Sequence, residues 1–249
     1  MADIVTVNLG DAQVTLIQDG AINLPADEML PGFVPADWAG LLPEPRPGQL
    51  VRVDGEVILI DSGLGLATEE DGQGGALLPA LAELGVAPGA VTRVIITHTH
   101  GDHLGGLLDR SGATPRPVFP RARHHLPRAD WAWVEGFPAE TRDAYLDPLR
   151  VLPELTLDDA DARLTPSVRS VGAAGHTPGH RCIVVASGGR SFAFLGDLVH
   201  SPTLHFATPE RATTWDAQPD LPPPSRRRIA AAAVAGGGVP GWTWRPSGR

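Results

Sequence analysis

The sequence predicts a single α/β domain, and three observations lead to that expectation. The chain has 249 residues, a length at which one α/β domain is common. Hydrophobic residues make up 42% of it, which is enough to bury a sizeable core. Short β-branched runs alternate with helix-like segments, and no linker-like stretch separates them. We therefore treat residues 1–249 as one domain.

Several segments of the first hundred residues have the patterns of regular structure. Runs rich in β-branched residues predict strands over 14–20, 49–53, 57–60 and 91–96. Asp54-Gly55 separates two of these runs and predicts a hairpin turn. Leucines and alanines over 76–84 predict a helix. Residues 25–48 are rich in proline, which disfavours helices and central strands, so we expect a loop there that could lie over a site.

The second half continues the alternation of strands and helices. Apolar runs predict strands over 116–123, 168–171, 182–186 and 191–195. Residues 130–152 have a mixed pattern of helix and loop, and Ser225 is placed to cap an arginine- and alanine-rich helix.

Charge and composition exclude several classes of function. The formal net charge is −9, which disfavours a nucleic-acid partner because phosphate neutralisation needs a basic face. All 20 basic residues are arginine, so a lysine Schiff base and a Walker-type phosphate loop are excluded. The sequence contains no signal peptide and no apolar run of about 18 residues, so we expect a cytoplasmic protein with no membrane partner. A small-molecule substrate is the expected partner, and a homodimer is left open.

The sharpest chemical signal follows the expected strand over 91–96. His98 and His100 stand two residues apart at the strand end, so both imidazoles can leave the same side. Gly101 permits a sharp turn, after which Asp102 and His103 follow directly. Three imidazoles and one carboxylate form a ligand set suited to Zn²⁺, Fe²⁺ or Mn²⁺.

Two later segments fit the same chemistry. His176 lies in the sequence Gly175-His-Thr-Pro-Gly-His180, in an expected turn between strands. Asp197 ends the apolar sequence Phe194-Leu-Gly-Asp. One more histidine and a bridging aspartate would complete a site for two ions about 3.5–4 Å apart.

These three segments resemble those of the metallo-β-lactamase superfamily, and the resemblance covers roughly residues 10–235. Asp61 in the sequence 58–65 also matches that family. The resemblance implies a four-layer αββα sandwich, with two mixed β-sheets flanked by helices. It assigns the first ion to His98, His100 and His176, the second ion to Asp102 and His103, and a bridging position to Asp197.

The sequences 196–200 and 213–220 resemble the methyl parathion hydrolase and lactonase-like branch of the family. Acyl-homoserine lactonases usually have a tyrosine where this chain has His200. His200 could donate a proton to the developing oxyanion or leaving group, or it could hydrogen-bond to Asp197. The family also supplies a last histidine ligand near residues 234–240, which this sequence lacks, and the tail over 236–249 is atypical. The second ion could then rely on Asp102, His103, Asp197 and water, or His205 could substitute, or the chain could be an altered variant with damaged activity.

The predicted function is hydrolysis of an ester, lactone or phosphotriester by a metal-bound hydroxide, with Asp102 and His200 as catalytic residues. Five aromatic residues could line the substrate pocket, namely Phe33, Trp38, Trp131, Trp133 and Phe206. Cys182 lies in an expected strand and is read as a core residue rather than a nucleophile. A β-lactamase or glyoxalase II-like thioesterase remains an alternative, as do an iron-dependent persulfide dioxygenase-like enzyme and a non-catalytic metal-binding module.

Overall fold

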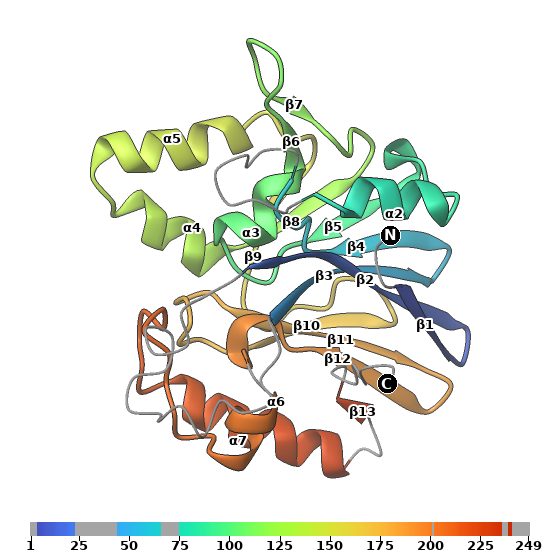
Figure 1. Ribbon diagram of the computed structural model, residues 1–249, viewed down its shortest axis with the longest axis vertical. Coiled ribbons are helices and arrows are strands. Elements are labelled where there is room, and N and C mark those ends of the chain that lie inside the picture. The colour runs from blue at the N-terminus through green and yellow to red at the C-terminus, as the bar shows by residue number, and fades with distance from the viewer. Residues whose placement is uncertain (1–3, 23–43, 66–74, 201, 236–238, 241–249) are drawn as a thin grey trace.

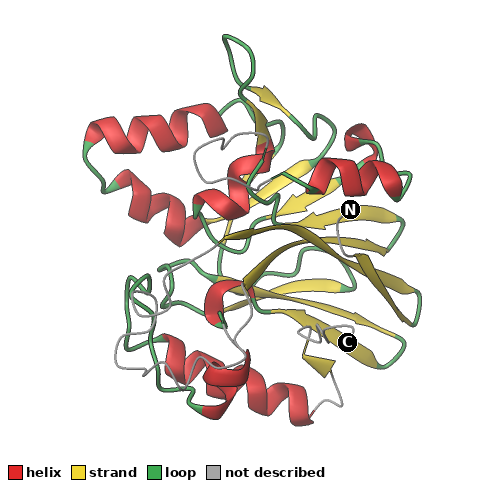
Figure 2. Cartoon of the chain, viewed as in Figure 1, coloured by secondary structure: helices red, strands yellow, loops and turns green. Residues whose placement is uncertain are grey.

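A computed structural model describes residues 4–22, 44–65, 75–200, 202–235 and 239–240 of the chain. Its two main sheets lie face to face, and helices cover the outer face of each (Figure 1). Figure 2 shows the resulting order of layers, which is helix, sheet, sheet, helix. This is the αββα sandwich that the sequence predicts.

The larger sheet has the strand order β1-β2-β3-β4-β5-β8-β9 within the described residues. Strands β1 to β4 pair antiparallel, whereas β4, β5, β8 and β9 pair parallel. The strand bounds are β1 Ile4–Leu9, β2 Ala12–Ile22, β3 Glu44–Val53, β4 Glu56–Ile60, β5 Arg93–Ile95, β8 Arg123–Pro127 and β9 Leu155–Asp158. Parallel strands place their carboxyl ends at one edge, where ligand sites of α/β sheets form.

The smaller sheet has the order β10-β11-β12-β13, and a short separate ribbon joins β6 to β7. Its first three strands pair antiparallel and β13 pairs parallel to β12. The bounds are β10 Val168–Gly172, β11 Arg181–Ser187, β12 Arg190–Phe194, β13 Val239–Pro240, β6 Leu108–Asp109 and β7 Arg116–Pro117.

Helices α2 to α5 lie on the side of the larger sheet, and α6 and α7 lie on the side of the smaller sheet (Figure 1). Their bounds are α2 Leu77–Glu83, α3 Gly101–Leu104, α4 Arg128–Glu135, α5 Ala139–Leu149, α6 Pro202–Ala207 and α7 Pro222–Ala235. The described residues also form the short 3-10 helices η2 Pro88–Ala90, η3 Gly105–Leu107 and η4 Gly196–Leu198. Among the described residues, no helix is both long and apolar enough to cross a membrane.

Three clusters of buried side chains hold these layers together. One lies between the larger sheet and its helices and includes Leu59, Leu81 and Trp131. The second lies between the two sheets and contains Val51 and Ile58 from the larger sheet and Ile183 from the smaller sheet. A third, smaller cluster lies beneath α7. Burying apolar area stabilises the fold by about 25 cal/mol per Å², so the interface between the sheets is a main determinant of how their ends are aligned.

Two expectations about strands are corrected. The loop expected over 25–48 gives way to β3 at Glu44, and Pro45 and Pro47 lie inside that strand. Both prolines pair only with β2, because β4 begins to pair with β3 at Gln49. A proline is tolerated where its missing N–H faces no neighbouring strand. The strand expected over 116–123 is instead split between β7 and β8. Residues 23–43, 236–238 and 241–249 lie outside the described residues.

Candidate metal centre

The predicted ligand residues meet where strands of both sheets end. Strand β5 leads into Thr97–His100, and helix α3 follows with Asp102 and His103. From the smaller sheet, His176 comes from the turn between β10 and β11, and Asp197 follows β12. Gly196 has a φ of +54°, a conformation that glycine adopts without strain, and it turns the chain so that Asp197 faces the other sheet. Gly101, in contrast, has no positive φ and simply begins α3.

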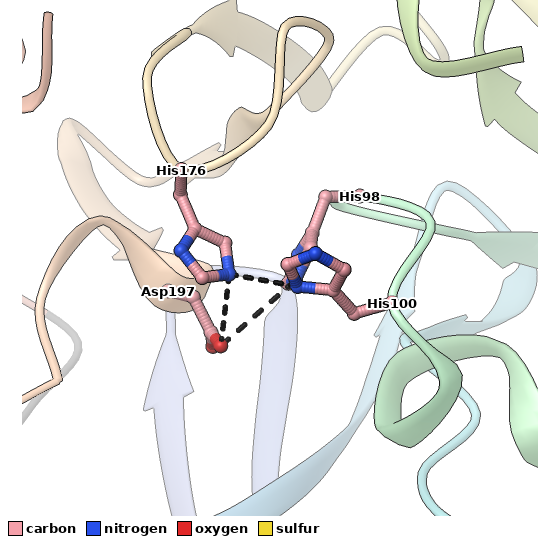
Figure 3. A group of neighbouring side chains, drawn as sticks. All are labelled: His98, His100, His176 and Asp197. Carbon is pink, nitrogen blue, oxygen red and sulfur yellow. Dashed lines mark hydrogen bonds and ion pairs between the residues drawn. The ribbon is translucent and has the colours of Figure 1, made fainter. Parts of the chain in front are cut away.

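The side chains of His98, His100, His176 and Asp197 form a compact group, which we call the three-histidine group (Figure 3). Nε2 of His98 lies 3.1 Å from Nδ1 of His100, and Nε2 of His176 lies 2.9 Å from the same Nδ1. Oδ2 of Asp197 lies 3.4 Å from Nε2 of His176 and 3.9 Å from Nε2 of His98. The four donor atoms all lie within 4.8 Å of one another.

A second cluster, which we call the acidic group, consists of Asp102, His103 and Asp197. Nε2 of His103 lies 3.2 Å from Oδ1 of Asp197 and 3.5 Å from Oδ2 of Asp102. Asp197 therefore belongs to both clusters, with Oδ2 facing the three-histidine group and Oδ1 facing the acidic group. This is the arrangement expected of a carboxylate that bridges two cations.

Hydrogen bonds to Nδ1 of His98 and of His103 determine that Nε2 of each ring faces the metal-binding groups. The carboxylate of Asp61 only accepts, so the Thr97 hydroxyl donates to it, at 2.8 Å. That hydroxyl must then accept from Nδ1–H of His98, at 3.1 Å, which leaves the lone pair of His98 on Nε2. Asp61 also accepts from Nδ1–H of His103, at 2.8 Å. Asp61 itself has a φ of +55°, a conformation that aspartate tolerates better than most residues.

His176 is oriented in the same way by Asp216. Nδ1–H of His176 donates to Oδ1 of Asp216, at 3.2 Å, and Nε2 again faces the group. Asp216 also accepts from the backbone N–H of Thr213, at 2.7 Å, and lies 3.8 Å from the buried guanidinium of Arg226. The backbone N–H of Ala217 donates to the carbonyl of His176, at 3.0 Å, so the two segments are tied together on both sides of the ring.

The residues of the three-histidine group fit a transition-metal cation. Zinc–nitrogen distances of 2.0–2.1 Å in a tetrahedral site imply nitrogens about 3.3 Å apart, close to the separations observed. Burial lowers the pKa of His98 well below its ordinary value and lowers the pKa of His100 to about 4, with the neighbouring imidazoles adding to both shifts. The rings of His98 and His100 are therefore neutral at pH 7, which is the form that binds a metal.

The acidic group has the opposite electrostatics. Burial by itself lowers the pKa of His103, but the carboxylates of Asp197, Asp102 and Asp61 together raise it well above the ordinary value. Nε2 of His103 is buried and has no hydrogen bond of acceptable geometry in the described part of the chain. A positive charge, whether a proton or a metal cation, is thus favoured between these carboxylates.

Three further histidines lie near the centre but in neither group. His200 is buried, with Nε2 at 3.4 Å from Oδ2 of Asp197 and its ring against His176. The ring centroid of His180 lies 5.1 Å from that of His98, and the ring of His205 lies 6.1 Å from that of His200. His205 therefore does not join the acidic group as the substitute ligand considered above.

The structure also locates the other predicted residues. Cys182 is buried in β11, and burial raises the pKa of its thiol to about 12, which fits a core residue. Trp131 is buried in the cluster between the larger sheet and its helices, and Trp133 is half-buried and packs against the same cluster. Phe206 is exposed, and the expectation for Phe33 and Trp38 lies outside the described residues.

Asp216 contacts the three-histidine group but was not among the residues predicted from the sequence. It lies in the sequence 213–220, which resembles the methyl parathion hydrolase and lactonase-like branch but for which no site residue was predicted. Its signal is weak, because an aspartate 40 positions away from His176 gives no local indication of contact. The partner of a metal-binding imidazole is chosen by tertiary packing, and no short-range pattern predicts it.

Comparisons with known proteins agree with this geometry. Residues 50–234 match the model of the Metallo-beta-lactamase superfamily. The mouse "Metallo-beta-lactamase domain-containing protein 1" is 40% identical over 90 residues, which cover 33% of this chain and 32% of that protein. A hydroxyacylglutathione hydrolase of Pseudomonas entomophila is 28% identical over 137 residues, covering 53% of this chain and 44% of that protein. The chain thus matches less than half the length of these curated relatives.

The fold agrees over a much longer stretch with a solved structure. AidC, a dizinc quorum-quenching lactonase in complex with a product, N-hexnoyl-L-homoserine, superposes with a TM-score of 0.84 at 21% identity. The superposition covers 99% of this chain and 96% of that chain. Family model, fold and the spacing of the histidine and aspartate residues lead to one conclusion: the chain belongs to the metallo-β-lactamase superfamily.

Proposed function

We propose that the protein is a metal-dependent hydrolase that acts on an ester, lactone or phosphotriester. The observation that carries this proposal is the position of Asp197, whose two oxygens face two separate groups of potential ligands. Bound there, one or two divalent cations such as Zn²⁺ would activate water at neutral pH and polarise an oxygen of the substrate. The likeness to a dizinc lactonase supports the lactone class in particular.

The chain's own residues supply orientation and proton transfer in this proposal. The carboxylate of Asp102, 3.5 Å from Nε2 of His103, would accept a hydrogen bond from the attacking water. His200, whose Nε2 lies 3.4 Å from Oδ2 of Asp197, would donate a proton to the leaving group. Asp61 and Asp216 keep the imidazoles of His103 and His176 turned inward.

The test is a hydrolysis panel on the protein loaded with Zn²⁺. A lactone, a carboxylic ester and a phosphotriester are assayed before and after a chelator, together with the variants His98→Ala and His124→Ala. His124 is as buried as His98 but lies outside both groups, in β8. We expect the chelator and His98→Ala to abolish turnover and His124→Ala to retain it. Turnover that survives both treatments would overturn the proposal.

A thioesterase is the second candidate, because a hydroxyacylglutathione hydrolase is among the matched relatives. A glutathione thioester added to the same panel distinguishes the two. Hydrolysis of the thioester at a kcat/KM well above that of every lactone and oxygen ester would favour this second candidate.

A further inference from the structure

Asp130 is a buried carboxylate near the start of α4 that belongs to neither metal-binding group. Its side chain is fully buried in the chain's folded state. A carboxylate without solvent must be satisfied by donors from the protein itself. The identity of those donors indicates what the residue does.

The donors come from the two loops that carry the three histidines. Oδ2 of Asp130 accepts from the backbone N–H of Thr99, at 2.9 Å, and from its hydroxyl, at 3.3 Å. The same oxygen accepts from the hydroxyl of Thr177, at 2.9 Å. Oδ1 accepts from the backbone N–H of Gly179. Thr99 stands between His98 and His100, and Thr177 directly follows His176.

The contact between Asp130 and the second loop leaves no space for a side chain. A Cβ atom at Gly179 would lie 2.6 Å from the backbone nitrogen of Asp130 and 2.7 Å from its Oδ1. The turn over 175–180 is therefore seated directly on the first turn of α4. The glycine in this turn is required by that close approach.

The two loops leave different sheets, since the first follows β5 and the second joins β10 to β11. The carboxylate of Asp130 accepts hydrogen bonds from both loops and therefore fixes the distance between them. We propose that Asp130 is a positioning residue, which keeps His98 and His100 at the distance from His176 at which the three imidazoles share one cation. This inference rests on the metal-binding part of the proposed function.

The test measures metal affinity rather than hydrolysis. Asp130→Asn keeps the size of the side chain but turns an N–H₂ group toward at least one of the donors, which leaves that pair unsatisfied. We expect this variant to bind Zn²⁺ about 10–100-fold more weakly, as measured by competition with a chromophoric chelator. Its Co²⁺ complex should also have altered visible absorption bands, because these depend on ligand geometry.

Asp19→Asn is the matched control. Asp19 is equally buried, and its carboxylate accepts from the backbone N–H groups of Leu64, at 2.8 Å, and Leu77, at 2.6 Å. Neither donor belongs to a histidine loop. We expect this variant to lose stability while its affinity for Zn²⁺ and its Co²⁺ spectrum remain those of the wild type.

Thr177 provides a second, milder pair of variants in case Asp130→Asn fails to fold. Thr177→Val removes one of the four hydrogen bonds and should weaken Zn²⁺ binding by several-fold, whereas Thr177→Ser keeps the hydroxyl and should restore it. Wild-type affinity in both Asp130→Asn and Thr177→Val would overturn the inference, as would equal weakening in Asp19→Asn. A wild-type protein that binds no cation would instead overturn the proposed function together with this inference.

Discussion

The three-histidine group and the acidic group share Asp197 but are assembled in different ways. The first combines loops from both sheets, whereas the second takes two consecutive residues from α3 and adds only Asp197 from the other sheet. Burial keeps the imidazoles of His98 and His100 in the first neutral, while carboxylates favour a positive charge on His103 in the second. The first therefore depends on how the sheets are aligned, and the second on local charge.

The largest expected effect comes from Asp197→Ala, because this change removes a ligand from both groups. We expect the variant to bind Zn²⁺ at least about 100-fold more weakly than the wild type. Metal content per chain after dialysis, determined by elemental analysis, checks this. Asp54→Ala is the control, since that carboxylate accepts from Thr165 and Ser167 far from both groups. Equal metal content in the two variants would contradict the shared role of Asp197.

Removing the metal should lower the stability of the protein, and variants in the two groups should differ in how much of this effect they retain. A ligand present at 100 times its Kd stabilises the native state by about 2.7 kcal/mol per site. We expect a chelator to lower the free energy of unfolding of the wild type by at least that amount. His176→Ala should lose the stabilisation contributed by the three-histidine group, and His103→Ala should keep it. Urea unfolding with and without Zn²⁺ measures both, and a wild type indifferent to Zn²⁺ would refute the prediction.

The two orienting carboxylates should have smaller effects. Asp216→Asn leaves Nδ1 of His176 without its charged acceptor, and we expect affinity for Zn²⁺ to fall about 10–100-fold. Asp61→Asn should weaken the acidic group similarly and also lower stability, because Asp61 accepts from the backbone N–H of Thr97 as well. Metal competition and urea unfolding on the same samples distinguish the two. If Asp216→Asn binds Zn²⁺ as tightly as the wild type, the orienting role of Asp216 is wrong.

The effect most remote from metal binding concerns His205, a buried imidazole that lies in neither group. Burial, together with the charge of Arg226, lowers its pKa to about 3. Its pKa in the folded state is below that of the unfolded chain, so the unfolded chain takes up the proton first as pH falls. Stability is therefore lost between about pH 6.5 and pH 3, by up to ~1.4 kcal/mol per pH unit.

His205→Gln removes this contribution. We expect the variant in its metal-free form to lose less stability than the wild type when the pH is lowered from 6.5 to 5. Urea unfolding at each pH measures the difference. Parallel pH profiles for the two proteins would show that His205 is not the group responsible.

Local patterns predicted the regular elements near the centre well. The buried run that ends before Thr97 is β5, and the apolar run that ends at Leu195 is β12. The errors arose where neighbours decide the structure. Prolines 45 and 47 are accepted in β3 because that part of the strand has a partner on one side only. Trp131 of α4 is buried in the core beside the larger sheet, which composition by itself does not indicate.

The sequence by itself determined which residues can bind a cation, because clustered imidazoles and carboxylates at strand ends have few other uses. It also determined the αββα fold class, through the resemblance carried by three short motifs. Only the tertiary structure decided how Asp197 divides its two oxygens, and which carboxylates orient the rings. The orienting contacts join residues about 40 positions apart, namely His103 with Asp61 and His176 with Asp216. The packing of the two sheets determines which carboxylate contacts each imidazole, and no sequence pattern within one segment predicts such a contact.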